Sequence, residues 1–416
     1  MELSLNGRAL GLTLLFSLGS AQVSQAAPLT WQECAQEVVR KNPDLAAAQQ
    51  SVLKARALAD AEKTSFFPQL SAEASVTKAK DSDDDHRMGL SARQPLFSGG
   101  RNTANVRKSA ANWEAAEAAL AVVQPQVGFD LRRAFAQLLY GQQQIELAES
   151  ITSRRQENVR LVELRYDAGR ENKGSFLRSR ASYLQSDFEV SQSERALRVA
   201  QRQLARVMGR DESEHLTVAG DLQAAASPDK GPDFRALARQ TPVRLQAEAQ
   251  ARSSEAGIGV ARSELFPQID AVAGVRRQGS HWPPDQNDWS GGLTLSFPFW
   301  PGGRNLFDVK AAQAESRRGW ANARSVYDQA VLELEQSFAG FQDAVQRMEV
   351  QRQFLTAAEV RAEIARSQYS AGLLSFQDWD QIENDLISTQ KAMLVSKRDA
   401  MIAEADWQRV AGKGAV

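Results

Sequence analysis

The chain contains 416 residues, of which 43% are hydrophobic and 24% are charged. This composition is typical of globular proteins, and the length is sufficient for two or three domains. The formal net charge of −1 does not provide the basic surface that a nucleic-acid-binding protein needs, so we expect no nucleic acid partner.

The first residues carry the pattern of a secretory signal peptide. Arg8 precedes an apolar run at 9–18, and the small residues of Ser24-Gln25-Ala26 follow at the spacing that a signal peptidase recognises. The run is too short to span a bilayer, which takes roughly 20 apolar residues. We therefore predict a signal peptide over 1–26; the alternative is a buried N-terminal helix.

The sequence offers little metal, cofactor or enzyme chemistry. Cys34 is the only cysteine, which excludes an intramolecular disulfide and a cysteine-cluster metal site, and we expect it to be buried on the first helix. The three histidines, His86, His215 and His281, do not have the spacing of metal ligands on a helix. No catalytic constellation or phosphate-binding glycine loop is visible, so we expect no metal, no cofactor and no enzymatic activity.

The mature chain opens with a helical pattern at 29–61 that is interrupted by Asn42-Pro43, which predicts a short helix, a break and a longer helix. The second half of the chain has a counterpart at Thr241-Pro242. From Pro43 to Pro68 is 25 residues, and from Pro242 to Pro267 is again 25. This equal spacing indicates a duplicated structural unit.

The proline that ends each of these helices marks a change to an alternating pattern of side chains. We predict strands over 70–80 and 87–97 in the first copy and over 269–279 and 290–299 in the second. They form two β-hairpins, 70–97 and 269–299. Strands of about ten residues with Phe and Trp at their ends suit a membrane barrel; the alternative is an ordinary soluble hairpin.

A Gly-Gly-Arg-Asn sequence follows each predicted β-hairpin. It occupies 99–102 and recurs at 302–305, 203 positions later. Because it lies between a strand pattern and a helix pattern, we interpret Gly99, Gly100, Gly302 and Gly303 as the corner between the two kinds of structure. Glycine suits such a corner because the turn requires unusual backbone dihedrals.

Each corner is followed by a long helical pattern. Asn102 to Tyr166 and Asn305 to Tyr369 are both 64 residues, which predicts helices of about 95 Å at 1.5 Å per residue. Pro125 predicts a kink or a break in the first of them. Helices of this length need lateral partners along their length, as in a coiled coil.

The chain itself supplies these partners. The turn signals at 166–169 and 369–372 are followed by helical patterns over 176–208 and 376–410, so each copy contains a long helical hairpin. The predicted domain organisation is a signal peptide at 1–26, a first repeat at 27–209 with its helical hairpin at 101–209, a linker at 210–232, and a second repeat at 233–416 with its helical hairpin at 304–410.

The predicted fold is therefore mainly α with a small β part. Four membrane strands cannot close a barrel, because the smallest membrane barrels have about eight strands and an open edge in lipid leaves backbone groups unpaired. We expect the chain to assemble with copies of itself. Two copies would supply eight strands and three copies twelve, with the helical hairpins continuing the barrel as a tube.

Four motifs together resemble the TolC-type outer-membrane efflux proteins over essentially the whole mature length: Asn42-Pro43-Asp44-Leu45, the paired Phe-Pro-Gln, the paired Gly-Gly-Arg-Asn and the paired Tyr-x-Ala-Gly. The resemblance implies a homotrimer with a shared twelve-stranded β-barrel in the outer membrane and an α-barrel tunnel through the periplasm. It also implies contact with outer-membrane lipid, a periplasmic adaptor (membrane fusion) protein and an inner-membrane transporter of RND or ABC type.

The function that the resemblance implies is a passive exit duct of a tripartite efflux pump for small molecules such as drugs or metal ions. One alternative is the exit duct of a type I protein secretion system. Another is a soluble periplasmic coiled-coil adaptor, which the duplicated hairpins disfavour. The sequence does not identify the cargo.

The resemblance also places a pore constriction where the two Tyr-x-Ala-Gly turns converge. Of two acidic family positions after the second turn, Asp378 occupies the first and Gln381 the second. An alternative role for Asp378 is to cap its helix on the surface. The constriction residues expected from the resemblance are Asp378, Gln381, Tyr369, Tyr166 and Ser175, with Asp380 and Glu383 nearby.

The two turns are, by the same resemblance, the tips that contact the adaptor. The expected contact residues are Gly169, Arg170, Gly372, Leu373, Leu374, Ser375 and Phe376. Leu373, Leu374 and Phe376 at an exposed tip are unfavourable unless a partner covers them. The alternative is that these three side chains pack within the helix ends.

Overall fold

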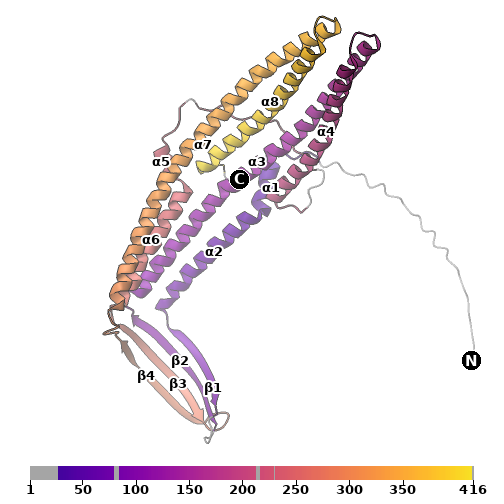
Figure 1. The fold of residues 1–416 in the computed structure, drawn as a ribbon. Helices are drawn as coiled ribbons and strands as arrows, with labels where there is room; N and C mark the ends of the chain where they lie inside the picture. Colours follow the sequence, from indigo (N-terminus) through magenta and orange to yellow (C-terminus); the bar gives the residue numbers. More distant parts are fainter. Residues whose placement is uncertain (1–26, 79–83, 212–215, 229, 415–416) are drawn as a thin grey trace, which may run out of the picture.

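The computed structural model describes residues 27–78, 84–211, 216–228 and 230–414. The predicted signal peptide at 1–26 lies outside this part, and so do residues 79–83, between the cores of the first two predicted strands. The chain is elongated, with a layer of long helices at one end and a small sheet at the other (Figure 1). The eight α-helices of the described part are α1 (Trp31–Lys41), α2 (Pro43–Lys63), α3 (Arg101–Asp167), α4 (Lys173–Met208), α5 (Phe234–Ala238), α6 (Pro242–Ser263), α7 (Arg304–Ser370) and α8 (Phe376–Val410).

The long helices form as the sequence predicts. Helices α3 and α7 are each 67 residues long, about 100 Å at 1.5 Å per residue. Pro125 is buried inside α3 and does not break it, although its missing N–H removes one helical hydrogen bond. In the described part of the chain, no helix combines the length and apolarity needed to cross a membrane.

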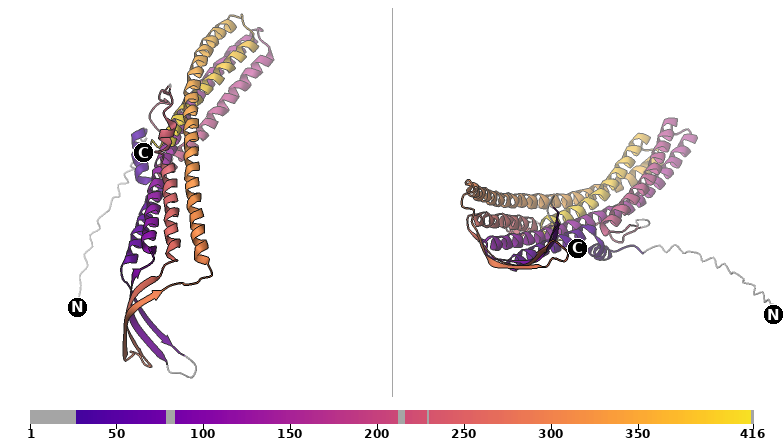
Figure 2. Two further views of the ribbon diagram at one scale, coloured as in Figure 1. Left: turned by 90° about the vertical axis from the view of Figure 1, so that its left-hand side faces the viewer. Right: turned by 90° about the horizontal axis from the view of Figure 1, so that it is seen from below.

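The helices form a single curved layer whose order changes along its length (Figures 1 and 2). In the half that carries the hairpin turns, α4 packs on α3, α3 on α8, and α8 on α7. In the half next to the sheet, the order is α2, α3, α6 and α7. Helix α7 is therefore one edge of the whole layer, and α4 and α2 together form the other edge.

The Asn42-Pro43 motif joins α1 to α2 beside the end of α4. The Asn42 side chain accepts from the Leu45 N–H at 2.9 Å and donates to the Val207 carbonyl at 2.8 Å. Cys34 is fully buried in the adjoining core, as expected, and burial raises the pKa of its thiol to about 11. The motif thus caps a helix and ties it to the first helical hairpin.

The sheet has four antiparallel strands in the order β1 (Gln69–Thr77), β2 (Asp85–Phe97), β3 (Gln268–Gly279) and β4 (Gln286–Ser296). Strands β2 and β3 come from different repeats. The prediction that the last strand covers 290–299 was wrong, since β4 begins at Gln286 and ends at Ser296. Ser296 pairs with Gln268, the first residue of β3, so no partner strand extends further. Strand β1 ends at Thr77, whereas the prediction extended to 80, and residues 79 and 80 lie outside the described part of the chain.

The pairing register divides the side chains of the sheet between two very different faces. Arg93 pairs with Asp270 at 2.5 Å and Arg276 with Asp288 at 2.9 Å on one face, which we call the polar face. The other, the apolar face, is composed mainly of Leu70, Ala72, Ala74, Val76, Met88, Leu90, Ala92, Ala271, Ala273, Val275, Trp289, Leu293 and Leu295.

The Gly-Gly-Arg-Asn motifs connect the sheet to the long helices, as predicted. Asn102 donates to the carbonyl of Ser65 at 3.0 Å, and Asn305 donates to the carbonyl of Glu264 at 2.8 Å. Ser65 and Glu264 are equivalent positions, one residue before Phe66-Phe67-Pro68 and Leu265-Phe266-Pro267. Both copies therefore make the same bond from the corner asparagine to the end of the preceding helix.

The two corners differ in how tightly their first glycine is packed. Gly99 and Gly302 have similar positive φ angles, 61° and 68°. A Cβ on Gly99 would lie 2.6 Å from the Ser263 carbonyl oxygen, whereas a Cβ on Gly302 would meet nothing within 4 Å. A side chain at Gly99 would therefore overlap the backbone at the end of α6, whereas a side chain at Gly302 would not.

We expect Gly99→Ala to destabilise the protein by about 2–4 kcal/mol, from backbone strain plus steric overlap. Gly302→Ala introduces the strain alone and should cost only about 1–2 kcal/mol. Denaturation midpoints of the two variants in detergent measure the difference. Equal losses would contradict the packing described for Gly99.

Candidate functional site at the hairpin tips

The tip of the second hairpin is built around Tyr369. This residue is fully buried, and its ring stacks on Trp379 at 4.2 Å between centroids and 10° between planes. Val162 of α3 belongs to the same cluster, so the cluster joins the two hairpins. We call it the tip core; it consists of Val162, Ala365, Tyr369 and Trp379, with Leu161, Phe176, Leu374, Phe376 and Ile382 packed against them.

Polar contacts reinforce this junction. Arg165 of α3 donates to the Tyr369 carbonyl at 2.6 Å, and its guanidinium carbon lies 4.6 Å from the centre of the Tyr369 ring. The Tyr369 hydroxyl donates to Glu171 at 3.1 Å. We call Arg165, Glu171 and Tyr369 the hairpin link. Burial, and then the Glu171 carboxylate, raise the pKa of Tyr369, so its hydroxyl stays a donor at neutral pH.

The first tip repeats part of this design. Tyr166 stacks on Phe176, ten residues further on, at 5.9 Å and 8°, just as Tyr369 stacks on Trp379, also ten residues further on. Tyr166 is exposed, however, whereas Tyr369 is fully buried. The two tyrosines therefore have different environments, although their motifs are the same.

A second polar cluster joins the hairpins further from the turns. Arg155 of α3 donates to Asn384 of α8 at 2.5 Å and lies 3.4 Å from Asp380. Arg178 of α4 lies 3.6 Å from the other oxygen of Asp380. Three helices are connected through this one carboxylate, which is only 14% exposed.

Glu383 lies next to this cluster and is almost completely buried, with 1% of its surface exposed. It accepts from Asn158 at 3.3 Å and lies 3.6 Å from Arg154. The expectation that Asp380 and Glu383 share a pore-lining role is not supported by these positions, because both side chains face α3. We call Arg154, Arg155, Asn158, Asp380, Glu383 and Asn384 the polar clasp.

Asp378 lies at the start of α8, where its carboxylate accepts from the Ser375 hydroxyl at 2.7 Å. The same hydroxyl accepts from the Asp378 N–H at 3.2 Å, so Asp378 helps cap the helix, which is the alternative role expected from its position. Gln381 donates to Asp385 at 2.8 Å. Asp378 and Gln381 are both exposed, which leaves them free to line a channel.

The other expected constriction residues lie differently. Ser175 is 7% exposed, and its N–H donates to Asn172 at 2.9 Å at the start of α4. Tyr369 is buried in the tip core. Both side chains are buried within the chain, so they contribute to the tip through packing.

The expected adaptor-contacting residues divide into two groups. Leu374 and Phe376 pack against the tip core, which is the alternative considered for them, whereas Leu373 is 79% exposed. The remaining four, Gly169, Arg170, Gly372 and Ser375, are all exposed. Leu373 is thus the one large apolar side chain of this set that a partner would need to cover.

The described residues contain no group of three or more His, Cys, Asp or Glu side chains placed to bind a metal ion. In the hairpin link, Arg165 donates to the Tyr369 carbonyl and the Tyr369 hydroxyl donates to Glu171. The polar clasp consists of arginine–carboxylate and amide contacts between α3 and α8. Such contacts tie the helices of the two hairpins together. Their position at one end of the helical layer makes them suited to control whether the hairpins separate.

Comparison with known proteins gives a consistent result. A family model described as outer membrane efflux protein matches residues 34–210 and 235–413. The probable outer membrane lipoprotein SilC of Salmonella typhimurium is 22% identical over 374 residues, covering 86% of this chain and 80% of that protein. The cation efflux system protein CusC of Escherichia coli O6:H1 is 23% identical over 378 residues, with coverage of 86% and 80%. A crystal structure of CusC superimposes with a TM-score of 0.82 at 20% identity, covering 92% of both chains.

Proposed function

The chain belongs to the outer membrane efflux protein family, and from this we propose that it is the exit duct of a tripartite efflux pump. Small molecules such as drugs or metal ions would pass through it without being chemically changed. The similarity to CusC, which is named as part of a cation efflux system, favours metal ions among the possible cargoes. The observation that carries the proposal within the structure is the sheet with one apolar and one polar face.

The two faces suit a sheet that separates lipid from water. Strands in a membrane barrel alternate between lipid-facing apolar and lumen-facing polar side chains, with aromatic residues at both interfaces. Here aromatic side chains lie at both ends of the strands. Exposed examples near the helices are Phe66, Phe67, Phe266, Phe297, Phe299 and Trp300, and at the far end they are Trp282 and Trp289.

The open edges of the chain support closure into a ring. Strands β1 and β4 each have an unpaired edge, which is costly in lipid. The helical layer likewise ends in α7 on one side and in α4 and α2 on the other. When copies of the chain are related by rotation about one axis, each edge of a copy meets the opposite edge of the next copy. Three copies supply the twelve strands that we propose for the barrel.

Matching apolar stripes on the two helix edges support the same assembly. Along the helix axes, Leu184 of α4 and Val360 of α7 both lie about 15 Å from the hairpin turn of their own helix. Phe188 of α4 and Phe354 of α7 both lie about 23 Å from the same turns. All four side chains are more than half exposed in the single chain. Contact between α4 of one copy and α7 of the next would cover them.

The hairpin tips then converge at the periplasmic end of the tube. We propose that the hairpin link and the polar clasp hold the closed state, and that Asp378 from three copies lines the constriction. The exposed Leu373 and Arg170 would meet a periplasmic adaptor protein, which connects the duct to an inner-membrane transporter. The exposure of Leu373 at the tip supports an interface there.

Planar-bilayer recordings of the purified channel test the constriction. Three carboxylates at a narrow point attract cations, so a trivalent cation should block the wild-type channel. We expect Asp378→Asn to weaken this block about tenfold, because the ring loses three charges. Gln381→Asp adds a second ring and should strengthen the block by a similar factor.

Glu349→Gln is a matched control, since Glu349 is an exposed carboxylate on α7 that pairs with Arg352 on its own helix. It should leave the block unchanged. Equal block in the wild type, Asp378→Asn and Gln381→Asp would show that neither position lines the constriction. A folded oligomer that never conducts ions would contradict the proposed duct itself.

A further inference from the structure

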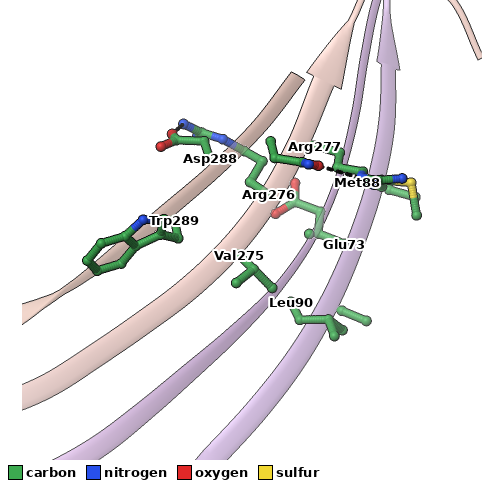
Figure 3. Close-up of a pocket in the computed structure, with 12 residues that line it drawn as sticks. Glu73, Met88, Leu90, Val275, Arg276, Arg277, Asp288 and Trp289 are labelled. Atoms are coloured by element: carbon green, nitrogen blue, oxygen red, sulfur yellow. Dashed lines mark hydrogen bonds and ion pairs between the residues drawn. The ribbon is translucent and has the colours of Figure 1, made fainter. Parts of the chain in front are cut away.

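The apolar face of the sheet contains a groove near the end of the strands that is farthest from the helices. The groove has a volume of about 760 Å³ and is shared by all four strands (Figure 3). Its apolar lining includes Ala72, Leu90, Val275 and Trp289. A groove of this kind on a lipid-facing surface is shaped for hydrocarbon.

One charged residue interrupts this apolar face. The structure describes every residue of the four strands, and of their charged side chains seven lie on the polar face while Arg277 alone lies on the apolar face. The preceding residue, Arg276, lies on the polar face and pairs with Asp288 at 2.9 Å. The side chains of these two neighbouring arginines therefore lie on opposite faces of the sheet.

Arg277 has only one polar contact among the described residues. Its Nε donates to the Asn287 side-chain oxygen at 2.5 Å. No carboxylate of the described chain lies within ion-pair distance of it, and Asp84 and Asp85 near this end are paired with Lys78 and Arg87. The two terminal amino groups of the guanidinium thus have no acceptor in this part of the chain.

A cation on a lipid-facing surface is unfavourable unless it reaches the membrane interface or meets an anion there. Arg277 lies two residues before the end of β3, at the height of the interface if the sheet spans the membrane. The anion available at that height is a lipid phosphate. A guanidinium matches phosphate well, because its fork of N–H groups bonds two oxygens at once.

We propose that this groove is a binding site for a lipid that carries a phosphate group. The phosphate accepts from the Arg277 guanidinium, and the Asn287 contact fixes the guanidinium plane. The acyl chains lie on Val275, Leu90 and Trp289 (Figure 3). The site rests on the proposed position of the sheet in the outer membrane and adds a specific lipid contact to it.

The test is lipid binding to the purified full-length oligomer in detergent, counted by native mass spectrometry. The probe is phosphatidic acid, with diacylglycerol of the same chains and inorganic phosphate as separate arms. We expect Arg277→Gln to weaken phosphatidic acid binding about tenfold, the effect of losing a charge-assisted contact. Arg87→Gln is the matched control, because Arg87 lies on the polar face and does not line the groove, and this variant should bind as the wild type does. Arg277→Lys, which keeps the charge but not the fork, should fall between them.

Three outcomes would overturn the site: equal loss in both glutamine variants, no loss in either, or diacylglycerol binding as tightly as phosphatidic acid. Binding of inorganic phosphate alone with the affinity of the lipid would also contradict it, because the groove would then contribute nothing. Conductance of the same preparation is measured in parallel. A conducting oligomer with no lipid preference refutes this site alone, whereas a non-conducting one refutes the proposed duct.

Discussion

Replacing Arg165 by alanine is expected to raise the fraction of time that the channel is open by about tenfold or more. Arg165 joins the two hairpins through the Tyr369 carbonyl and ring. A hydrogen bond from a charged group contributes about 1.5–3 kcal/mol, and each 1.4 kcal/mol is a factor of ten in an equilibrium constant. The loss occurs once per chain, so the effect is multiplied in an oligomer. Single-channel recording in planar bilayers measures it directly.

Two further variants sharpen this prediction. Tyr369→Phe removes only the bond to Glu171 and keeps the stack on Trp379, so it should open the channel less than Arg165→Ala does. Arg155→Ala breaks the polar clasp and should add to the effect of Arg165→Ala. Arg170→Ala is the matched control, because Arg170 is an exposed arginine at the same tip that the hairpin link does not use. If Arg165→Ala and Arg170→Ala conduct alike, the hairpin link does not hold the channel closed.

The second large effect is expected at the subunit edges. Phe188→Glu on α4 or Phe354→Glu on α7 places a carboxylate in the proposed contact between copies. Burying a charge without a partner costs several kcal/mol, so the oligomer should not form. The measurement is the loss of the oligomer band from unheated gel samples of outer-membrane fractions.

Leu164→Glu is the control for this edge prediction. Leu164 is 60% exposed but belongs to α3, which lies inside the helical layer rather than at its edge. The variant should assemble normally. Combining Phe188→Lys with Phe354→Glu should restore part of the assembly, because the two new charges then meet across the contact. Failure of Leu164→Glu to assemble would show that the loss is not specific to the edges.

The long helices were predictable because their signals are local. Proline, the Gly-Gly corners and a long run of helix-forming residues define where α3 and α7 begin, and the duplication confirms each boundary by its counterpart. The end of β4 was not predictable in this way. It depends on where its partner strand begins, at Gln268, which is a property of the pairing rather than of the residues near Ser296.

The candidate site shows the same difference between local and distant signals. The Tyr-x-Ala-Gly motif located Tyr369, but not its partners Arg165 and Glu171, which come from the other repeat. Likewise, no local pattern connects Arg155 with Asp380, since 225 residues separate them. Only the packing of α3 on α8 brings them together. The sequence does contain one usable signal, an aromatic residue ten positions after each tip tyrosine.

The most direct test of the account is disulfide cross-linking between the edges of neighbouring copies. Leu184→Cys on α4 is combined in turn with a cysteine at Phe354, Val360 or Ile364 on α7, and outer-membrane fractions are oxidised. The native Cys34 does not interfere, because it is fully buried. Helices α4 and α7 of one chain lie at opposite edges of the layer, so any disulfide must join two copies. We predict a covalent ladder that stops at the trimer for at least the Val360 pair. Cross-linking that yields only monomers, or a ladder that extends beyond three chains, would contradict the closed ring.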